Sequence, residues 1–307
     1  MLDAGAIIAS VPPPMWAAAA AVAAGAVVGL SLGLTGGGGA IFAVPLLVYW
    51  IGVEPRTAVG ISLVTVAATA AVGTVERWRH GQVEFRTGLL FAVAGMLTTP
   101  LGSWLGGQIP PQALMAAFAG LMILIAVRMW LKAADTRERM PAACFASGVG
   151  PTCSRDEQGR LRMTTQCFVL LALVGLVVGL LSGLFGVGGG FLIVPALVAF
   201  ATMNVPRAVG TSLFVMTLVG ATAAAGQVAS GRTLPLDIAA GFVAGSVPAV
   251  FAGSSIGRRL TGPTLARVFA VAILAVAAFV ISKTALGSGS FHVAPRPVTA
   301  RPETVAP

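Results

Sequence analysis

Residues 33–45 read Gly-Leu-Thr-Gly-Gly-Gly-Gly-Ala-Ile-Phe-Ala-Val-Pro, and residues 183–195 read Gly-Leu-Phe-Gly-Val-Gly-Gly-Gly-Phe-Leu-Ile-Val-Pro. Several positions carry an identical residue 150 positions later, namely Gly33, Gly36, Gly38, Gly39, Val44 and Pro45. Each copy lies inside a long apolar stretch. In membrane chains, paired apolar segments interrupted by glycine in two halves are the best sequence-level indication of a binding site. The motif therefore predicts a duplicated membrane fold with its site at the glycines.

The composition indicates a chain whose solvent is lipid. Of the 307 residues, 57% are hydrophobic and 9% are charged, and the mean hydropathy is +0.93. A soluble protein of this size could not cover so much apolar side chain. The formal charge of +9 comes from Lys and Arg that lie almost entirely between apolar runs. There they orient membrane spans, so we expect contact with the lipid bilayer and not with nucleic acid.

Tryptophan spacing divides the first half into spans. Trp50, Trp78, Trp104 and Trp130 are 28, 26 and 26 residues apart, which fits one helical crossing and a short turn each. Apolar runs with almost no charge lie between them, at 58–75, 89–105 and 114–131. The second half repeats these runs at 208–228, 238–256 and 265–281. We predict a membrane helix in each of the six runs.

The segment that carries each glycine motif does not fit a single crossing. Trp16 and Trp50 are 34 residues apart, too far for one ordinary span and too close for two with a turn. A helix loses about 1 kcal/mol per glycine relative to alanine, so residues 36–39 break it. We expect two helical arms that meet at a glycine loop, with the second arm starting near Ala40 and, in the other copy, near Gly190.

The predicted fold is an all-α polytopic membrane protein with two pseudo-symmetric repeats. Each repeat has a broken or re-entrant glycine-loop segment and three transmembrane helices, which makes about eight membrane segments. The first membrane repeat covers 1–132, a polar linker on the cytoplasmic side covers 133–166, the second repeat covers 167–285, and a disordered tail rich in Pro covers 286–307. Residues 156–162, which include Gly159, suit a small turn or hairpin.

The three cysteines, Cys144, Cys153 and Cys167, lack the spacing of a zinc site. We expect free thiols, with a Cys144–Cys153 bridge as the alternative if that loop meets an oxidant.

Basic residues leave two orientations of the halves open. If each broken segment is re-entrant, the halves are inverted, and Arg207, Arg258 and Arg259 share the cytoplasmic side with Arg77 and Arg79. If each segment crosses fully, the halves are parallel and Arg232, Lys283, Arg296 and Arg301 are cytoplasmic instead. We favour the inverted arrangement, because it brings both glycine loops to the midplane from opposite sides.

The glycine loops are the candidate site. A broken helix exposes backbone N–H groups, and the N-terminus of the following helix carries about half a positive charge. Two such ends that face each other would bind a small anion without a buried arginine. The hydroxyls that could assist are Ser31, Thr35, Ser62, Thr65, Ser182, Thr211, Ser212 and Thr217. The predicted substrate-binding residues are Thr35, Gly36, Gly37, Gly38, Gly39, Ser62, Gly186, Gly188, Gly189, Gly190, Thr211 and Ser212, and Pro45 and Pro195 are predicted to kink the returning arms.

Glycine has a second use in membrane helices, because it lets helix backbones approach closely. We expect this packing role for the pairs Gly102/Gly106, Gly241/Gly245 and Gly253/Gly257, which are spaced by four residues. Four consecutive glycines at 36–39 exceed what packing needs, and no Lys-Ser or Lys-Thr follows them as in a phosphate loop. For the prolines, helix geometry alone is the alternative role, and single hydroxyls usually bond the preceding turn of their own helix.

The doubled motif resembles the TauE/SafE family, because each copy is followed by Pro-Arg and by Ala-Val-Gly-x-Ser-Leu, at 55–63 and 206–213. The likeness covers about residues 16–285. It implies a secondary transporter of the bacterial inner membrane that moves small sulfur-containing anions, such as sulfite or organosulfonates. Ala40 stands where the second copy has Gly190, so the two loops need not be equivalent.

We expect such a transporter to work by alternating access around the two loops, without a bound cofactor or metal. A proton or sodium gradient would couple the movement, or it would run as simple uniport. The alternative is a channel or an accessory membrane subunit without transport of its own. No catalytic residue is proposed, because no nucleophile, metal cluster or acid–base pair lies near the predicted spans. The substrate, the direction of transport and the oligomeric state stay open.

Overall fold

The computed structural model describes residues 15–134, 154–155, 161–162, 165–201, 203–229, 235–257 and 274. Most of the predicted linker, all but residue 274 of the predicted span at 265–281, and the predicted disordered tail at 286–307 lie outside these residues. Expectations for those parts of the chain stay predictions.

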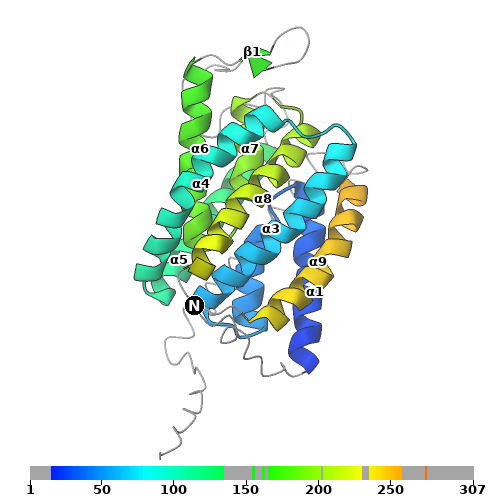
Figure 1. The fold of residues 1–307 in the computed structure, drawn as a ribbon, viewed down its shortest axis with the longest axis vertical. Coiled ribbons are helices and arrows are strands. Elements are labelled where there is room, and N and C mark those ends of the chain that lie inside the picture. The colour runs from blue at the N-terminus through cyan, green and yellow to red at the C-terminus, as the bar shows by residue number, and fades with distance from the viewer. Residues whose placement is uncertain are drawn as a thin grey trace, which may run out of the picture.

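The described chain is a bundle of helices (Figure 1). The first half contains α1 (Met15–Thr35), α2 (Ala40–Pro45), the π-helical turn η2 (Leu46–Trp50), α3 (Pro55–Arg79), α4 (Phe85–Gln108) and α5 (Pro111–Ala134). The second half contains α6 (Thr165–Phe185), α7 (Gly190–Phe200), α8 (Val205–Ala229) and α9 (Leu236–Gly257). Two-residue strands, β1 (Ser154–Arg155) and β2 (Leu161–Arg162), pair in antiparallel register, which agrees with the hairpin expected around Gly159.

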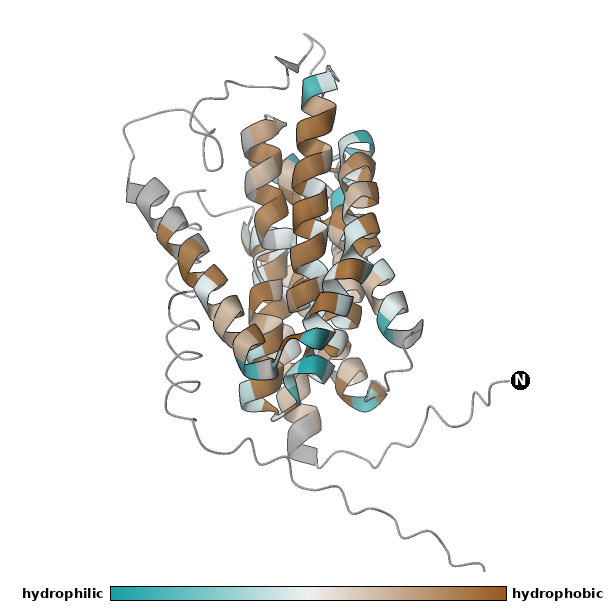
Figure 2. Ribbon diagram, turned by 90° about the vertical axis from the view of Figure 1, so that its left-hand side faces the viewer, coloured by the Kyte–Doolittle hydropathy of each residue, from teal (hydrophilic) through white to brown (hydrophobic). Residues whose placement is uncertain are grey.

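Six of the described helices are long and apolar enough to cross a membrane, and they are α1, α3, α4, α6, α8 and α9. The apolar segments Ala40–Trp50 and Gln112–Leu124 are shorter. Figure 2 shows apolar residues along the bodies of the helices, with hydrophilic residues gathered towards their ends. The expectation of a polytopic helical membrane protein is therefore confirmed. The total of about eight membrane segments stays a prediction.

Glycines bring helix backbones into direct contact in two pairs, α1 with α9 and α4 with α6. A Cβ atom on Gly29 would lie 2.7 Å from the Cα and the carbonyl carbon of Ser246, and one on Gly102 would overlap the carbonyl oxygen of Leu180. No side chain larger than hydrogen fits there unless a helix moves. The packing role expected for Gly102, Gly245 and Gly253 is thus confirmed, because a Cβ on each would overlap a carbonyl oxygen of the neighbouring helix.

The contacts also give the direction of each helix. Gly25 lies against Phe242 and Gly33 against Val250, so α1 and α9 are parallel, and the α3 pairs Thr69–Ser246 and Glu76–Ser254 align α3 with them. In the same way α4 is parallel to α6, through Gly95–Gly179 and Gly102–Leu180, and to α8, through Gly88–Thr211 and Gly95–Val219. Between α3 and α8 the pairs Gly73–Leu213 and Ala67–Gly220 show an antiparallel crossing. Hence α1, α3 and α9 run one way and α4, α6 and α8 run the other.

The core lies where these two sets meet. In Figure 1, α1 and α9 lie on one side, α4 and α6 on the other, and α3 and α8 between them. α3 and α8 are accordingly the most buried of the six long helices. The short arms α2 and α7 contact α3 and α8, respectively, and the glycine breaks that precede them are buried inside the bundle.

Two local expectations can be compared with the structure. Trp50, Trp78 and Trp104 lie near the ends of their helices with at least half of each side chain exposed, as expected at a membrane interface.

Cys167, near the start of α6, is disulfide-bonded, so the expectation of a free thiol is wrong at this position. Its partner lies outside the described residues.

Candidate functional site

The two glycine motifs form a pair of loops that touch in the core. The first glycine loop (residues 36–39) joins α1 to α2, and the second (residues 186–189) joins α6 to α7. The second arms begin at Ala40 and Gly190, as predicted. A Cβ atom on Gly37 would lie 2.5 Å from the carbonyl carbon and oxygen of Gly190, and both loops are buried. The structure therefore brings together two segments that are 150 residues apart in the chain.

Backbone conformation explains part of the glycine content. Gly36 has φ = 74° and Gly186 has φ = 71°, in the left-handed region that residues with a Cβ avoid. Gly188 and Gly189 are also left-handed, with φ of 67° and 69°. In addition, a Cβ on Gly186 would lie 2.8 Å from the Cα of Val59. Conformation and space both require glycine at this turn.

Each loop is held by a serine from the other half of the chain. The hydroxyl of Ser62 on α3 donates a hydrogen bond of 2.7 Å to the carbonyl oxygen of Gly186. The hydroxyl of Ser212 on α8 donates to the carbonyl oxygen of Gly36. These serines occupy matching positions 150 residues apart, and both are fully buried. Their hydroxyls fix the loops in place, which is a more specific role than the ligand contact predicted for them.

The loop N–H groups are the donors that the site offers. In the first loop, the N–H of Gly38 donates to the hydroxyl of Thr35, at 3.0 Å. Among the described residues, the N–H groups of Gly37 and Gly39, and those of Val187, Gly188 and Gly189 in the second loop, donate to no protein acceptor. A buried N–H without an acceptor costs about as much as a lost hydrogen bond, so such groups suit a bound anion or water.

Thr211 and the two prolines, which were also predicted to belong to the site, lie outside the glycine loops. The hydroxyl of Thr211 accepts a 3.0 Å hydrogen bond from the N–H of Glu84, so it faces the start of α4 instead of the glycine loops. Pro45 is the last residue of α2, and the π-helical turn η2 begins directly after it. Proline has no N–H and cannot continue the regular hydrogen-bond pattern, which explains the change of helix type. Pro195 lies within α7, which continues to Phe200.

Sequence reasoning missed one residue that supports the first loop. Arg77 on α3 is 6% exposed, and its guanidinium donates to the carbonyl oxygen of Gly33 at 3.2 Å and to Oε1 of Gln82 at 3.1 Å. It thus ties the end of α1 to the end of α3. The sequence suggested only a charge that orients the span, and nothing in the local pattern names Gly33 as its partner.

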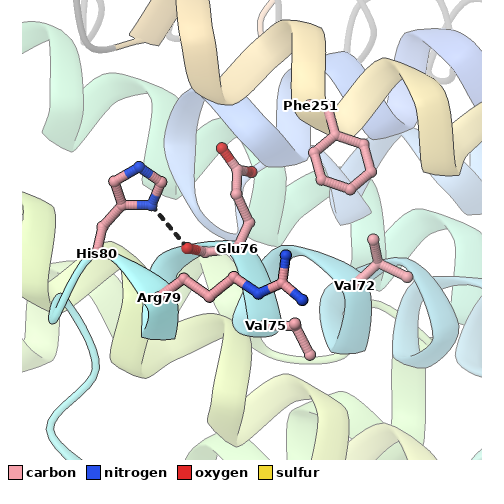
Figure 3. A pocket seen from close by; sticks show the side chains of 6 residues that line it. All are labelled: Val72, Val75, Glu76, Arg79, His80 and Phe251. Atoms are coloured by element: carbon pink, nitrogen blue, oxygen red, sulfur yellow. Dashed lines mark hydrogen bonds between the residues drawn. The ribbon is translucent and has the colours of Figure 1, made fainter.

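A separate groove of about 390 Å³ lies between the last turns of α3 and the side of α9 (Figure 3). It is lined by Val72, Val75, Glu76, Arg79, His80 and Phe251. The carboxylate of Glu76 accepts a 2.6 Å hydrogen bond from Ser254 of α9. None of the lining residues belongs to the glycine loops. In the described part of the chain, no three His, Cys, Asp or Glu side chains gather as metal ligands would.

Comparisons with known proteins agree with this architecture. Residues 21–280 match a family model described as "Sulfite exporter TauE/SafE". A probable membrane transporter protein of Xylella fastidiosa (strain Temecula1) is 34% identical over 263 residues, which cover 85% of this chain and 93% of the relative. The probable membrane transporter protein YunE of Bacillus subtilis is 27% identical over 262 residues, or 83% of this chain and 94% of the relative. No solved structure matches the chain.

Proposed function

The chain belongs to the TauE/SafE family of membrane transporters and is a multi-pass protein of the bacterial cell membrane, and from this premise we propose that it carries a small anion, either sulfite or an organosulfonate. The observation that carries the proposal is the contact between two buried glycine loops, in which five N–H groups donate to no acceptor among the described residues. Backbone N–H groups at the start of a helix attract negative charge without a buried cation. The name of the family, sulfite exporter, supports sulfite as the first candidate.

The transport cycle that we propose is alternating access between two inverted repeats. Under this assignment α1 to α5 form one repeat and α6 to α9, with the following span, form the other. The opposite directions of the two helix sets support it, as do the reciprocal bonds of Ser62 and Ser212. Each broken segment then packs against the third long helix of the other repeat, α1 with α9 and α6 with α4. Rocking of one set against the other would expose the paired loops to each side in turn.

The proposed binding site consists of the loop glycines and Gly190, together with Thr35, Ser62, Thr211 and Ser212. The loops supply N–H donors, whereas the two serines hold the loops so that the donors stay in place. Thr211 acts from a distance, through the start of α4. Coupling to a proton or sodium gradient remains part of the proposal, with simple uniport as the alternative.

The test is sulfite movement in proteoliposomes that contain the purified full chain. We expect saturable uptake of labelled sulfite, with sulfate, thiosulfate and sulfoacetate as competitors. Gly37→Ala should lose uptake, because its Cβ would meet the backbone of Gly190 and separate the loops. Gly120→Ala is the matched control, since no described atom lies within 4 Å of a Cβ there.

Two outcomes would count against the proposal. If folded wild-type protein moved none of these anions, the substrate class would be wrong. If uptake failed to saturate and single-channel currents appeared, the chain would be a channel and not an alternating-access transporter.

A further inference from the structure

The two glycine loops differ in how well they satisfy their own hydrogen bonds. In the first loop, Thr35 uses its hydroxyl twice, because it donates to the carbonyl of Ser31 at 2.7 Å and accepts from the N–H of Gly38. The position that matches Thr35 in the second loop is Phe185, which has no hydroxyl. The second loop therefore has no equivalent internal bond from its own motif.

At the position of Ser182 the difference between the copies is reversed, because the second copy has the hydroxyl and the first does not. Ser182 stands on the last turn of α6, where the first copy has Leu32. Ser182 is 1% exposed, and its hydroxyl has no hydrogen-bond partner among the described residues. Serine and threonine in a helix usually bond a carbonyl three or four residues earlier, as Thr65, Thr69 and Thr99 do. A buried hydroxyl without a partner is costly, so it calls for a specific explanation.

Ser182 packs against the second loop. The Cβ of Ser182 is 3.5 Å from the position that a Cβ on Gly189 would take, and the N–H of Gly186 donates to the carbonyl of Ser182. The neighbouring N–H groups of Val187, Gly188 and Gly189 have no protein acceptor in the described structure. α7, which begins at Gly190, has 11 residues, so the positive end of its dipole adds to these donors.

All of these groups offer hydrogens, and a site made of donors fits an oxyanion. We propose that the hydroxyl of Ser182 donates a hydrogen bond to the transported oxyanion, which binds at the second glycine loop. The first loop, with its internal Thr35 bond and with Leu32 in place of serine, is then the weaker side of the pair. This inference rests on the proposed transport of an anion, and it adds the residue and the loop that bind it.

The experiment compares sulfite binding by the wild-type full chain, Ser182→Ala and Ser246→Ala, measured by calorimetry on purified protein, with a melting curve for each. Loss of one hydrogen bond to a charged ligand should weaken sulfite binding by roughly tenfold to a hundredfold in Ser182→Ala. Its melting temperature should stay level or rise, because the substitution removes a hydroxyl that has no partner. Ser246 is the matched control, since it is a fully buried serine that bonds Thr69 and lies outside the loops.

We expect Ser246→Ala to melt earlier and to bind sulfite as the wild type does. Equal sulfite affinity in the wild type and Ser182→Ala would overturn the inference and leave the proposed transport standing. If the folded wild type bound neither sulfite, sulfate nor thiosulfate, both the inference and the proposed function would be wrong.

Discussion

Glycine has two different uses in this protein, one in the helix pairs and one in the loops. Along α1, α4, α6 and α9, glycines have ordinary helical conformation and are needed because a neighbouring backbone occupies the space of a Cβ. In the loops, Gly36, Gly186, Gly188 and Gly189 have positive φ, and the N–H groups of Gly188 and Gly189 donate to no acceptor among the described residues. One type of residue therefore permits close helix packing in one region and forms the candidate site in the other. The two uses should respond differently to the same added methyl group.

The largest effect is expected at Gly186, where both requirements coincide. Gly186→Ala places a Cβ in a left-handed residue and 2.8 Å from the Cα of Val59. The two costs together should lower the free energy of unfolding by about 3 kcal/mol or more and abolish transport. The measurement is yield, melting temperature and sulfite uptake. Normal uptake by Gly186→Ala would show that the second loop does not need this conformation.

The second prediction concerns a glycine that is needed only because a neighbouring backbone occupies the space of a Cβ. Gly29→Ala should cost about 1–3 kcal/mol, because α1 and α9 must separate to admit the methyl group. Uptake per folded molecule should stay near the wild-type value, since Gly29 lies outside the loops. Gly120→Ala serves as the reference and should gain about 0.5–1 kcal/mol from helix propensity. If Gly29→Ala were as stable as Gly120→Ala, the close contact of α1 and α9 would be wrong.

The third prediction concerns the serines that hold the loops. Ser62→Ala removes the donor to the carbonyl of Gly186 and should destabilise the protein by about 1–2 kcal/mol. Ser212→Ala should have a similar effect, because it plays the matching role for Gly36. The double variant tests the contact between the loops, and we expect a non-additive loss in melting curves. Strict additivity would mean that the two loops respond independently.

The smallest effect is expected at a glycine that is needed only for its left-handed backbone conformation. Gly52 has φ = 80°, and in the described part of the chain no atom would lie within 4 Å of a Cβ there. Gly52→Ala should therefore cost about 1 kcal/mol from backbone strain alone and leave sulfite uptake unchanged. A large loss of uptake in this variant would indicate that the turn between η2 and α3 takes part in transport.

Sequence alone was sufficient for features that depend on local chemistry. Apolar runs without charge predicted the positions of α3, α4, α5, α8 and α9, because lipid burial requires an uninterrupted apolar helix. The glycine clusters predicted the breaks and the restart of the helices at Ala40 and Gly190, since glycine weakens a helix wherever it occurs. The packing role of Gly102 and Gly253 followed from their spacing, and the family followed from the doubled motif.

Only the tertiary structure decided which groups meet. The sequence placed Ser62 and Ser212 near the site, but the bond of each serine to the loop of the other half depends on how α3 and α8 cross. Arg77 looked like an orienting charge and bonds Gly33, and Thr211 looked like a ligand contact and bonds Glu84. That the hydroxyl of Ser182 has no hydrogen-bond partner among the described residues is likewise visible only in the folded chain. Hydropathy and glycine content determine helices and their breaks locally, because they depend on each residue's own backbone and solvent. A hydrogen-bond partner, in contrast, depends on the packing of segments that are far apart in the chain.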